Sequence, residues 1–474
     1  MPSCYVGPLS PLNNNGEDIQ KIIMMNIKIL PRLLFTIREL RKHEGWTRSQ
    51  LEASQIEGLW RVREYAYAHS PFYKNFHRGL EDRPSNELPV LTKAMLMDHF
   101  DELVTDPSIR LDKVREFASG DAAQRLYLDR YWVTATSGSS GHPGFFLFNE
   151  QEWATVIASF ARGQEWSGAR VNLLHRRKMA TVASISPWHM SSQVAVTAKT
   201  PLTPSIRIAA SSPLEDIVKQ LNVWQPDLLI AYASMARILA EEQLAGRLHI
   251  SPDKVFTSSE VLTNETRRRV KAAWGDEPFN QYGATETADI AAEYDACRHM
   301  HVFEDLLLVE VVDEKYRPVP RGEYGAKLLL TTLFSQTQPL IRYEINDSVR
   351  WSPEPCPICG LPFGVIEGIQ GRVEDALSMP AAKGGQILIQ PLVFNRVMDI
   401  LPISGWQVVQ EVDSSLTVLL SGTRNGTHDE TVANAIRKEL TSEGVLVPPL
   451  KIQRVVEIPK NASGKAPLIK SKIH

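Results

Sequence analysis

The chain has 474 residues, which is more than one hydrophobic core usually supports, so two or more domains are expected. Its 52 Lys and Arg residues nearly balance 55 Asp and Glu residues, and without a basic excess we expect no nucleic acid partner. Four cysteines argue against a disulfide-stapled secreted domain. Polar residues and Pro31 interrupt the apolar stretch at residues 22–37, so it is expected neither to span a membrane nor to act as a secretory signal. The expected location is the cytoplasm.

Taken in chain order, residues 1–20 are rich in Pro, Asn and Gly and are expected to form a flexible tail. Apolar residues at three-to-four spacing predict a helix over residues 49–68. Helical and strand-like segments alternate across residues 213–270, which predicts an α/β unit with parallel strands. Residues 306–312 and 326–334 predict strands with little helix nearby, so the later part of the large domain should be more antiparallel.

The composition changes after Gly371. Strands are expected at residues 406–412 and 416–420 around a tight turn, followed by a helix over residues 429–440 and a strand at residues 451–458. This order predicts a small α+β domain of roughly 100 residues. The expected division is a tail at residues 1–20, a large domain at 21–371 and a small domain at 372–474.

A loop of small residues lies at residues 136–144, with the sequence TSGSSGHPG. In such a loop backbone N–H groups approach an anion closely and hydroxyls add donors, so phosphate oxygens are its natural ligand. It fits neither the Walker pattern nor the dinucleotide fingerprint, and a Ser/Gly-rich surface linker would have the same composition. The candidate phosphate-binding residues are Thr136, Ser137, Gly138, Ser139, Ser140 and Gly141.

Four further segments accompany this loop: QYGATE at residues 281–286, IRYEIND at 341–347, GRVED at 371–375 and IPKNASGK at 458–465. With these segments the chain resembles the adenylate-forming (AMP-binding) enzymes over residues 57–465, and most closely their phenylacetate-CoA ligase branch. The resemblance implies an α/β fold. A large multi-subdomain N-terminal adenylate-forming domain with mixed sheets would be followed by a small mobile α+β C-terminal domain.

The resemblance also implies how ATP and Mg²⁺ would be bound. The glycine-rich loop would fold around the triphosphate, Tyr282 would stack on adenine, Glu286 would bind magnesium and Asp347 would bind the ribose hydroxyls. Each carboxylate has two acceptor oxygens and can take a pair of hydroxyl hydrogen bonds or a hard Mg²⁺ ion. The intervening residues Gly283, Ala284 and Thr285 are assigned to the same nucleotide site.

Lys465 is the candidate catalytic lysine, because it ends a Pro-x-x-x-x-Gly-Lys element whose lysine, in the family, reaches into the site during adenylation. An ammonium between the attacking carboxylate and the α-phosphate offsets the repulsion of two anions most strongly in the transition state. The alternative is a solvated tail lysine beside Lys460.

Gly371 and Arg372 resemble the boundary at which the small domain pivots, and Arg372 is also assigned to the catalytic site. The hinge residue of the family is typically Asp or Lys, whereas Glu374 stands at that position here. Two other positions depart from the family pattern. Gly144 stands where lysine or threonine is common, and residues 344–346 replace the usual Arg-Thr-Gly before the ribose carboxylate. Neither departure removes a group that the chemistry needs.

Cys356 and Cys359 form a Cys-Pro-Ile-Cys-Gly turn that aims two thiolates at one ion. Cys297 and His301 supply the second pair needed for a tetrahedral site, and members of the phenylacetate-CoA ligase branch resemble this arrangement. A closed Cys₃His site is expected to hold structural Zn²⁺ and to perform no chemistry. A redox Cys-x-x-Cys is the competing interpretation, and His299 is an alternative ligand.

Trp188 and His189 lie in a region where the family builds its acyl pocket, and they are weak candidates for it. The resemblance implies a reaction in which ATP and a carboxylic acid, namely an aryl or arylacetic acid, form an acyl-adenylate, followed by transfer of the acyl group to a thiol. Coenzyme A or a carrier-protein phosphopantetheine would be the acceptor. Loading of a carrier protein or an amine is the enzymatic alternative, and a non-catalytic nucleotide-binding regulatory protein is the alternative of another class. The oligomeric state stays open.

Overall fold

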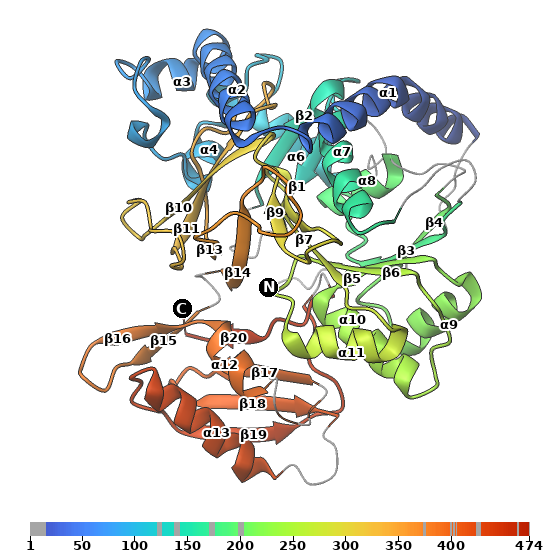
Figure 1. Ribbon diagram of the computed structural model, residues 1–474, viewed down its shortest axis with the longest axis vertical. Helices are drawn as coiled ribbons and strands as arrows, with labels where there is room; N and C mark the ends of the chain where they lie inside the picture. Colours follow the sequence, from blue (N-terminus) through green and yellow to red (C-terminus); the bar gives the residue numbers. More distant parts are fainter. Residues whose placement is uncertain are drawn as a thin grey trace.

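The computed structural model describes residues 16–120, 126–136, 143–169, 176–197, 203–372, 376–398, 401, 403, 405–422, 428–461 and 464–473. Most of the glycine-rich loop and the expected hinge residue lie outside these ranges, namely Ser137, Gly138, Ser139, Ser140, Gly141 and Glu374. The chain forms a large upper part and a smaller lower part in the view of Figure 1.

The largest sheet has nine strands in the order β13-β14-β9-β8-β7-β6-β5-β3-β4. Its parallel half consists of β3 (Met179–Ala183), β4 (Ser205–Ala209), β5 (Leu228–Tyr232), β6 (Lys254–Ser258) and β7 (Phe279–Ala284). Its antiparallel half consists of β8 (Ala288–Glu293), β9 (Met300–Val302), β13 (Asp347–Trp351) and β14 (Val365–Arg372). The sheet is therefore mixed, as predicted.

The parallel half also confirms the prediction from the alternating segments of residues 213–270. Three helices alternate with its strands: α9 (Leu214–Trp224), α10 (Ala233–Leu244) and α11 (Asn264–Trp274). α11 ends at Gly275, whose φ of +90° is the left-handed conformation that favours glycine at this position. Ligands of open α/β sheets bind beyond the carboxyl ends of the strands, so the ends of β5 and β6 are the place to look for a site.

The remaining helices of the large domain are α1 (Gly16–His43), α2 (Arg48–His69), α3 (Pro71–Phe76), η1 (Ser85–Glu87), α4 (Lys93–Asp98), α5 (Phe100–Leu103), α6 (Leu111–Ser119), α7 (Glu150–Trp166) and α8 (Met190–Thr197). The predicted helix over residues 49–68 is α2. α7 starts with a capping box in which Asn149 and Glu152 satisfy each other's backbone N–H groups. α7 packs against α1 and against β8.

The expected tail is wrong at its C-terminal end, because α1 begins at Gly16 and residues 16–20 are helical. Pro31 lies inside this helix, which shows that the interrupted apolar stretch continues as one element. Among the described residues, no helix is long and apolar enough to cross a membrane.

Two antiparallel sheets complete the large domain. A three-stranded sheet of β10 (Leu307–Val312), β11 (Lys327–Thr332) and β12 (Tyr343–Ile345) confirms the antiparallel pairing predicted for the later part. A hairpin of β1 (Trp132–Ala135) and β2 (Phe145–Phe148) carries the glycine-rich segment between its strands.

The small domain has its own hydrophobic core and lies below the large domain in Figure 1. A four-stranded sheet has the order β19-β18-β17-β20, with β17 (Gly405–Gln410), β18 (Leu416–Ser421), β19 (Leu450–Arg454) and β20 (Ile469–Ser471). The other elements are the hairpin β15 (Leu377–Pro380) and β16 (Gln386–Ile389), with α12 (Pro391–Met398) and α13 (Asp429–Ser442). The predicted α+β class is confirmed, and the domain boundary at Gly371 stays a prediction.

Candidate active site

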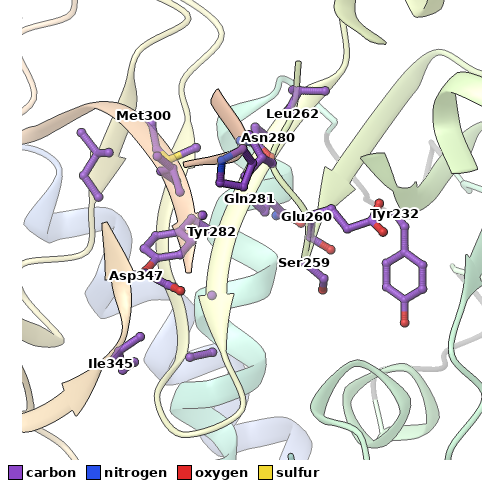
Figure 2. Close-up of a pocket in the computed structure, with 18 of the residues that line it drawn as sticks. Tyr232, Ser259, Glu260, Leu262, Asn280, Gln281, Tyr282, Met300, Ile345 and Asp347 are labelled. Carbon is purple, nitrogen blue, oxygen red and sulfur yellow. The ribbon is translucent and has the colours of Figure 1, made fainter. Parts of the chain in front are cut away.

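A cavity of about 1750 Å³ is lined by residues of both domains. The large domain contributes the ends of β5, β6 and β7, and the small domain contributes residues near the C-terminus. Figure 2 shows Tyr282 and Asp347 on one side of this cavity and Tyr232, Ser259 and Glu260 on the other. The cavity therefore lies at the carboxyl ends of the parallel strands, where ligands of α/β sheets bind.

The predicted adenine and ribose residues are in direct contact. The Tyr282 hydroxyl donates a hydrogen bond to Asp347 Oδ2 at 2.6 Å, although the two residues are 65 positions apart. Tyr282 is supplied by β7 and Asp347 by the start of β13. Since adenine and ribose are joined covalently, an aromatic face and a carboxylate this close suit a nucleoside. The neighbouring Gly283, Ala284, Thr285 and Glu286 also line the cavity.

The two ends of the glycine-rich segment are held together by Thr136. The Thr136 hydroxyl accepts a hydrogen bond from the Gly144 N–H at 2.8 Å. The Thr136 backbone N–H donates to the Gly144 carbonyl at 3.0 Å. The sequence did not indicate Lys93, whose Nζ donates to the Thr136 hydroxyl at 3.3 Å. A Cβ atom on Gly144 would lie 3.1 Å from Lys93 Cε. An ammonium from α4 thus lies where the family commonly has a lysine or threonine of the loop itself.

Lys465 extends from the small domain into the cavity. Its Nζ donates to the Ser259 carbonyl at 3.2 Å and lies 5.1 Å from the centre of the Tyr232 ring. Gly464 before it has φ +83°, and a Cβ atom there would lie 2.7 Å from backbone atoms of Ala210 and Ser211 in the large domain. The glycine therefore permits the close approach of the two domains that brings Lys465 to the cavity.

Glu260 is an acidic neighbour of this lysine that the sequence did not indicate. Its Oε2 accepts a hydrogen bond from the Ser234 N–H at 2.8 Å. Burial raises the pKa of Glu260, while the hydrogen bond from Ser234 and the charge of Lys465 act in the opposite direction. Burial and the charges of Lys465 and Arg207 lower the pKa of His189.

The two weak acyl-pocket candidates separate. His189 lines the cavity, whereas Trp188 is 9% exposed and packs in the hydrophobic core with its ring centre 5.5 Å from that of Phe117. The assignment of Trp188 to the pocket is therefore corrected, and the reason is that a large apolar side chain gains more from core packing. The backbone of Arg372 pairs with Asp347 between β14 and β13, next to the cavity.

The predicted metal ligands form a cluster in which the ligand atoms of Cys297, His301, Cys356 and Cys359 all lie within 4.8 Å of one another. His301 Nε2 is 3.4 Å from Cys297 Sγ and 3.2 Å from Cys359 Sγ. His301 Nδ1 lies 3.0 Å from the Phe363 carbonyl, which turns Nε2 toward the thiols.

Three thiols and one imidazole are a donor set that fits a tetrahedral Zn²⁺ ion. Burial opposes ionisation of the Cys356 thiol, but hydrogen bonds from the backbone N–H groups of Cys359 and Ile358 outweigh it and lower the pKa of Cys356 to about 6. His299 lies outside this group of four, with Nδ1 3.2 Å from Cys356 Sγ. The geometry favours His301 over His299 as the ligand.

A mixed nine-stranded sheet, a separate small α+β domain and an interdomain cavity match the fold of the adenylate-forming ligases. No protein-family model matches the chain. It is 25% identical over 354 residues to phenylacetate-coenzyme A ligase of Thermus thermophilus, covering 70% of this chain and 73% of the relative. Protein CapK of Staphylococcus aureus is 24% identical over 274 residues, covering 57% and 54%.

Among solved structures, 2-hydroxyisobutyryl-CoA ligase in its postadenylation state with R3-HIB-AMP has a TM-score of 0.71 at 19% identity and covers 90% of this chain and 91% of that chain. The same ligase in its thioesterification state has a TM-score of 0.58 at 19% identity, with 91% and 92% covered. These comparisons relate the chain to the AMP-forming acid–thiol ligases, and its sequence similarity is to the phenylacetate-CoA ligase branch of the adenylate-forming superfamily.

Proposed function

We propose that this enzyme activates an aryl or arylacetic acid with ATP and Mg²⁺ and transfers the acyl group to coenzyme A. In the first step the carboxylate attacks the α-phosphate, which forms an acyl-adenylate and releases pyrophosphate. In the second step the coenzyme A thiol attacks the acyl carbon, which forms the thioester and releases AMP. The observation that carries this proposal is the shared cavity, which is lined by Lys465 of the small domain and by the hydrogen-bonded Tyr282 and Asp347 of the large domain.

In this proposal the large domain binds the nucleotide. The Tyr282 ring stacks on adenine, Asp347 accepts hydrogen bonds from the ribose hydroxyls, and residues 136–141 hold the triphosphate with Lys93 at the base of the loop. Glu286 is the residue that would hold Mg²⁺, which neutralises phosphate charge when it is bound. Each role uses a group whose chemistry suits its ligand: an aromatic face, an acceptor pair, a set of donors and a hard anionic oxygen.

The small domain supplies Lys465, whose position relative to the large domain changes between the two steps of the proposed reaction. Lys465 lies between the attacking carboxylate and the α-phosphate, where an ammonium lowers the barrier by stabilising converging negative charge. For the second step we propose that the small domain rotates about residues 371–374, where Gly371 has φ +103°. The better match to a ligase in its postadenylation state supports an arrangement of the two domains like that state.

The experiment is pyrophosphate release by the purified protein with ATP, Mg²⁺ and a panel of aryl, arylacetic, fatty and amino acids, each with and without coenzyme A. Lys465→Ala should slow adenylate formation by about 10²–10³-fold, the usual cost of one preorganised charge donor. It should affect transfer from a supplied acyl-adenylate much less.

Lys460→Ala is the matched control, because Lys460 lies in the same segment and pairs with Glu457 at 2.8 Å. Equal losses of both half-reactions in Lys465→Ala would refute the assigned role. Absence of acid-dependent pyrophosphate release across the whole panel would refute the proposed function.

A further inference from the structure

Two buried polar side chains lie on the same face of the β7–β8 hairpin and line the cavity. Gly283 is the cross-strand partner of Asp289, and Gln281 lies two residues before Gly283, so Gln281 and Asp289 share a face. This face is turned toward α7, because a Cβ atom on Gly163 of α7 would collide with the Gln281 amide. Both side chains, together with Phe160 of α7, line the cavity.

The described residues leave one atom of each polar group without a partner. Gln281 Nε2 and Asp289 Oδ2 have no hydrogen-bond partner within the described part of the chain. Their residues are only 6% and 3% exposed. Most buried polar groups are paired, and an unpaired one costs a factor of about 5 to 150 in an equilibrium constant, so two in one wall call for a ligand.

The local backbone makes room for these groups. A Cβ atom on Gly283 would lie 2.8 Å from Asp289 Oδ1 and 2.8 Å from the Ala288 carbonyl. An irregularity in the β7–β8 register between Tyr282 and Gly283 turns Asp289 to this position. The pair therefore lies on the same hairpin as Tyr282, on the side that faces the helix.

Hydrogen-bonding groups also distinguish this side of the cavity from an ordinary apolar pocket. Burial raises the pKa of Asp289 well above its usual range, and Asp289 Oδ2 is available as a hydrogen-bond acceptor. The Gln281 amide nitrogen adds a donor, and Phe160 adds an aromatic surface on the opposite element. A ring that carries a polar substituent matches the three groups together.

We propose that Asp289 and Gln281 form the polar end of the acyl pocket and select a carboxylic acid whose acyl group carries a hydrogen-bond donor, either a hydroxyl or an amino group. This inference rests on the proposed function and makes its substrate class narrower. A donor on the substrate satisfies Asp289 Oδ2, and a hydroxyl oxygen also accepts from Gln281. An acid without such a substituent leaves both protein groups unpaired, and sites built to bind a substrate hydroxyl reject analogues that lack it.

The test compares matched acids by kcat/KM for pyrophosphate release. Phenylacetate and benzoate are the parents, and each is compared with all its ring-hydroxyl and ring-amino isomers. The natural enzyme should prefer at least one donor-bearing isomer over its parent by about 10- to 100-fold. Preference for a hydroxyl isomer or for an amino isomer supports the proposal in either case and identifies which donor is used.

Two variants test whether Asp289 and Gln281 are the residues that cause this preference. Asp289→Leu removes the acceptor, and Gln281→Leu removes the donor at the neighbouring position. Each should reduce the preference to within a few-fold, by slowing the donor-bearing acid more than the parent acid. Asp289→Asn keeps the volume and an acceptor oxygen, so it should retain part of the preference for a hydroxyl isomer.

The outcomes separate the two proposals. If none of the acids in the panel causes pyrophosphate release, the proposed function is overturned. Equal kcat/KM for parents and substituted acids, or a preference that survives in both leucine variants, would overturn this inference while the ligase activity stands. Removing an unpartnered polar group should leave the melting temperature unchanged or higher, so failure of both leucine variants to fold would also overturn it by showing a structural role.

Discussion

Replacing Gly464 by alanine tests whether the close approach of the two domains is what brings Lys465 to the cavity. Gly464 has φ +83°, and the new Cβ atom would lie 2.7 Å from the Ala210 carbonyl carbon and the Ser211 nitrogen. These are backbone atoms and cannot turn aside as the end of a side chain can. The turn that holds Gly464 is compact, because the Lys465 N–H donates to Asn461 Oδ1 at 3.0 Å, so the small domain has to move away.

The magnitude follows from two separate costs. A left-handed conformation costs alanine about 1 kcal/mol wherever it occurs. The overlap with the large domain adds about 2 kcal/mol, which is typical of overpacking, and this cost falls only on the closed arrangement. The closed population should drop about 30-fold, and adenylate formation with it. Transfer of the acyl group from a supplied acyl-adenylate should stay within a few-fold, because the proposed mechanism does not use Lys465 in that step.

Gly444→Ala is the matched control for this variant. Gly444 also lies in the small domain and also has φ +83°, but a Cβ atom there has nothing within 4 Å. It should lose about 1 kcal/mol of unfolding free energy and keep the natural rate of pyrophosphate release. Equal rates of adenylate formation in the two variants would refute the argument, because conformational strain alone would then explain both.

Two further predictions concern the metal cluster and a buried histidine. Cys356→Ser should abolish the stoichiometric zinc content measured by elemental analysis and lower the unfolding free energy by about 3 kcal/mol or more. The control variant Cys4→Ser should have neither effect. Full zinc content in Cys356→Ser would contradict the assignment of the metal site. Burial, assisted by the charge of Arg63, lowers the pKa of His77 to about 4, so the unfolded chain gains this proton near its ordinary pKa of 6.5 while the folded chain does not. Stability is therefore expected to fall by about 2 kcal/mol from pH 7 to pH 5, and His77→Phe should remove that part of the pH dependence measured by chemical denaturation. His249→Gln, at an exposed position, should leave it unchanged, and an unaltered pH dependence in His77→Phe would refute the reasoning.

The sequence predicted those parts of the fold that have a local periodicity. The alternation in residues 213–270 and the apolar runs near residues 306–334 depend on burial patterns that a single segment carries. β20 was not predicted, since it has three residues and exists only because it pairs in parallel with β17. Tertiary pairing rather than propensity decides such short strands.

The candidate site also combines residues that have a local sequence signal with residues that only tertiary packing brings together. Tyr282, Asp347 and Lys465 lie in recognisable segments, and the structure brings them to one cavity. Lys93 has no local signal, because its contact with the loop depends on how α4 packs, 43 positions before Thr136. Asp289 could not be recognised either. Only the register of the β7–β8 hairpin turns it toward α7 and leaves its Oδ2 without a partner among the described residues.

The metal cluster is connected through neighbouring strands to the carboxylate proposed for ribose. His301 in β9 is the cross-strand partner of Val365 in β14, and β14 in turn pairs Arg372 with Asp347 in β13. A metal ion bound to His301 would therefore hold the outer edge of the sheet on which Asp347 stands. The Tyr282–Asp347 hydrogen bond joins this edge to β7, so displacement of the edge strands would separate the two nucleoside contacts.

The residues after His301 are bound to α7 and α1. The guanidinium of Arg162 in α7 binds Asp305 with contacts of 2.8 and 2.6 Å, and His43 of α1 lies 2.7 Å from the same carboxylate. Burial alone would raise the pKa of Asp305, but the charge and hydrogen bonds of Arg162 outweigh burial and hold it at about 2. This ion pair includes none of the predicted metal ligands, so we expect the sheet to stay folded when the metal is removed. Metal removal should accordingly raise the KM for ATP more than it lowers kcat, because it loosens the nucleoside contacts while Lys465 remains on the other domain.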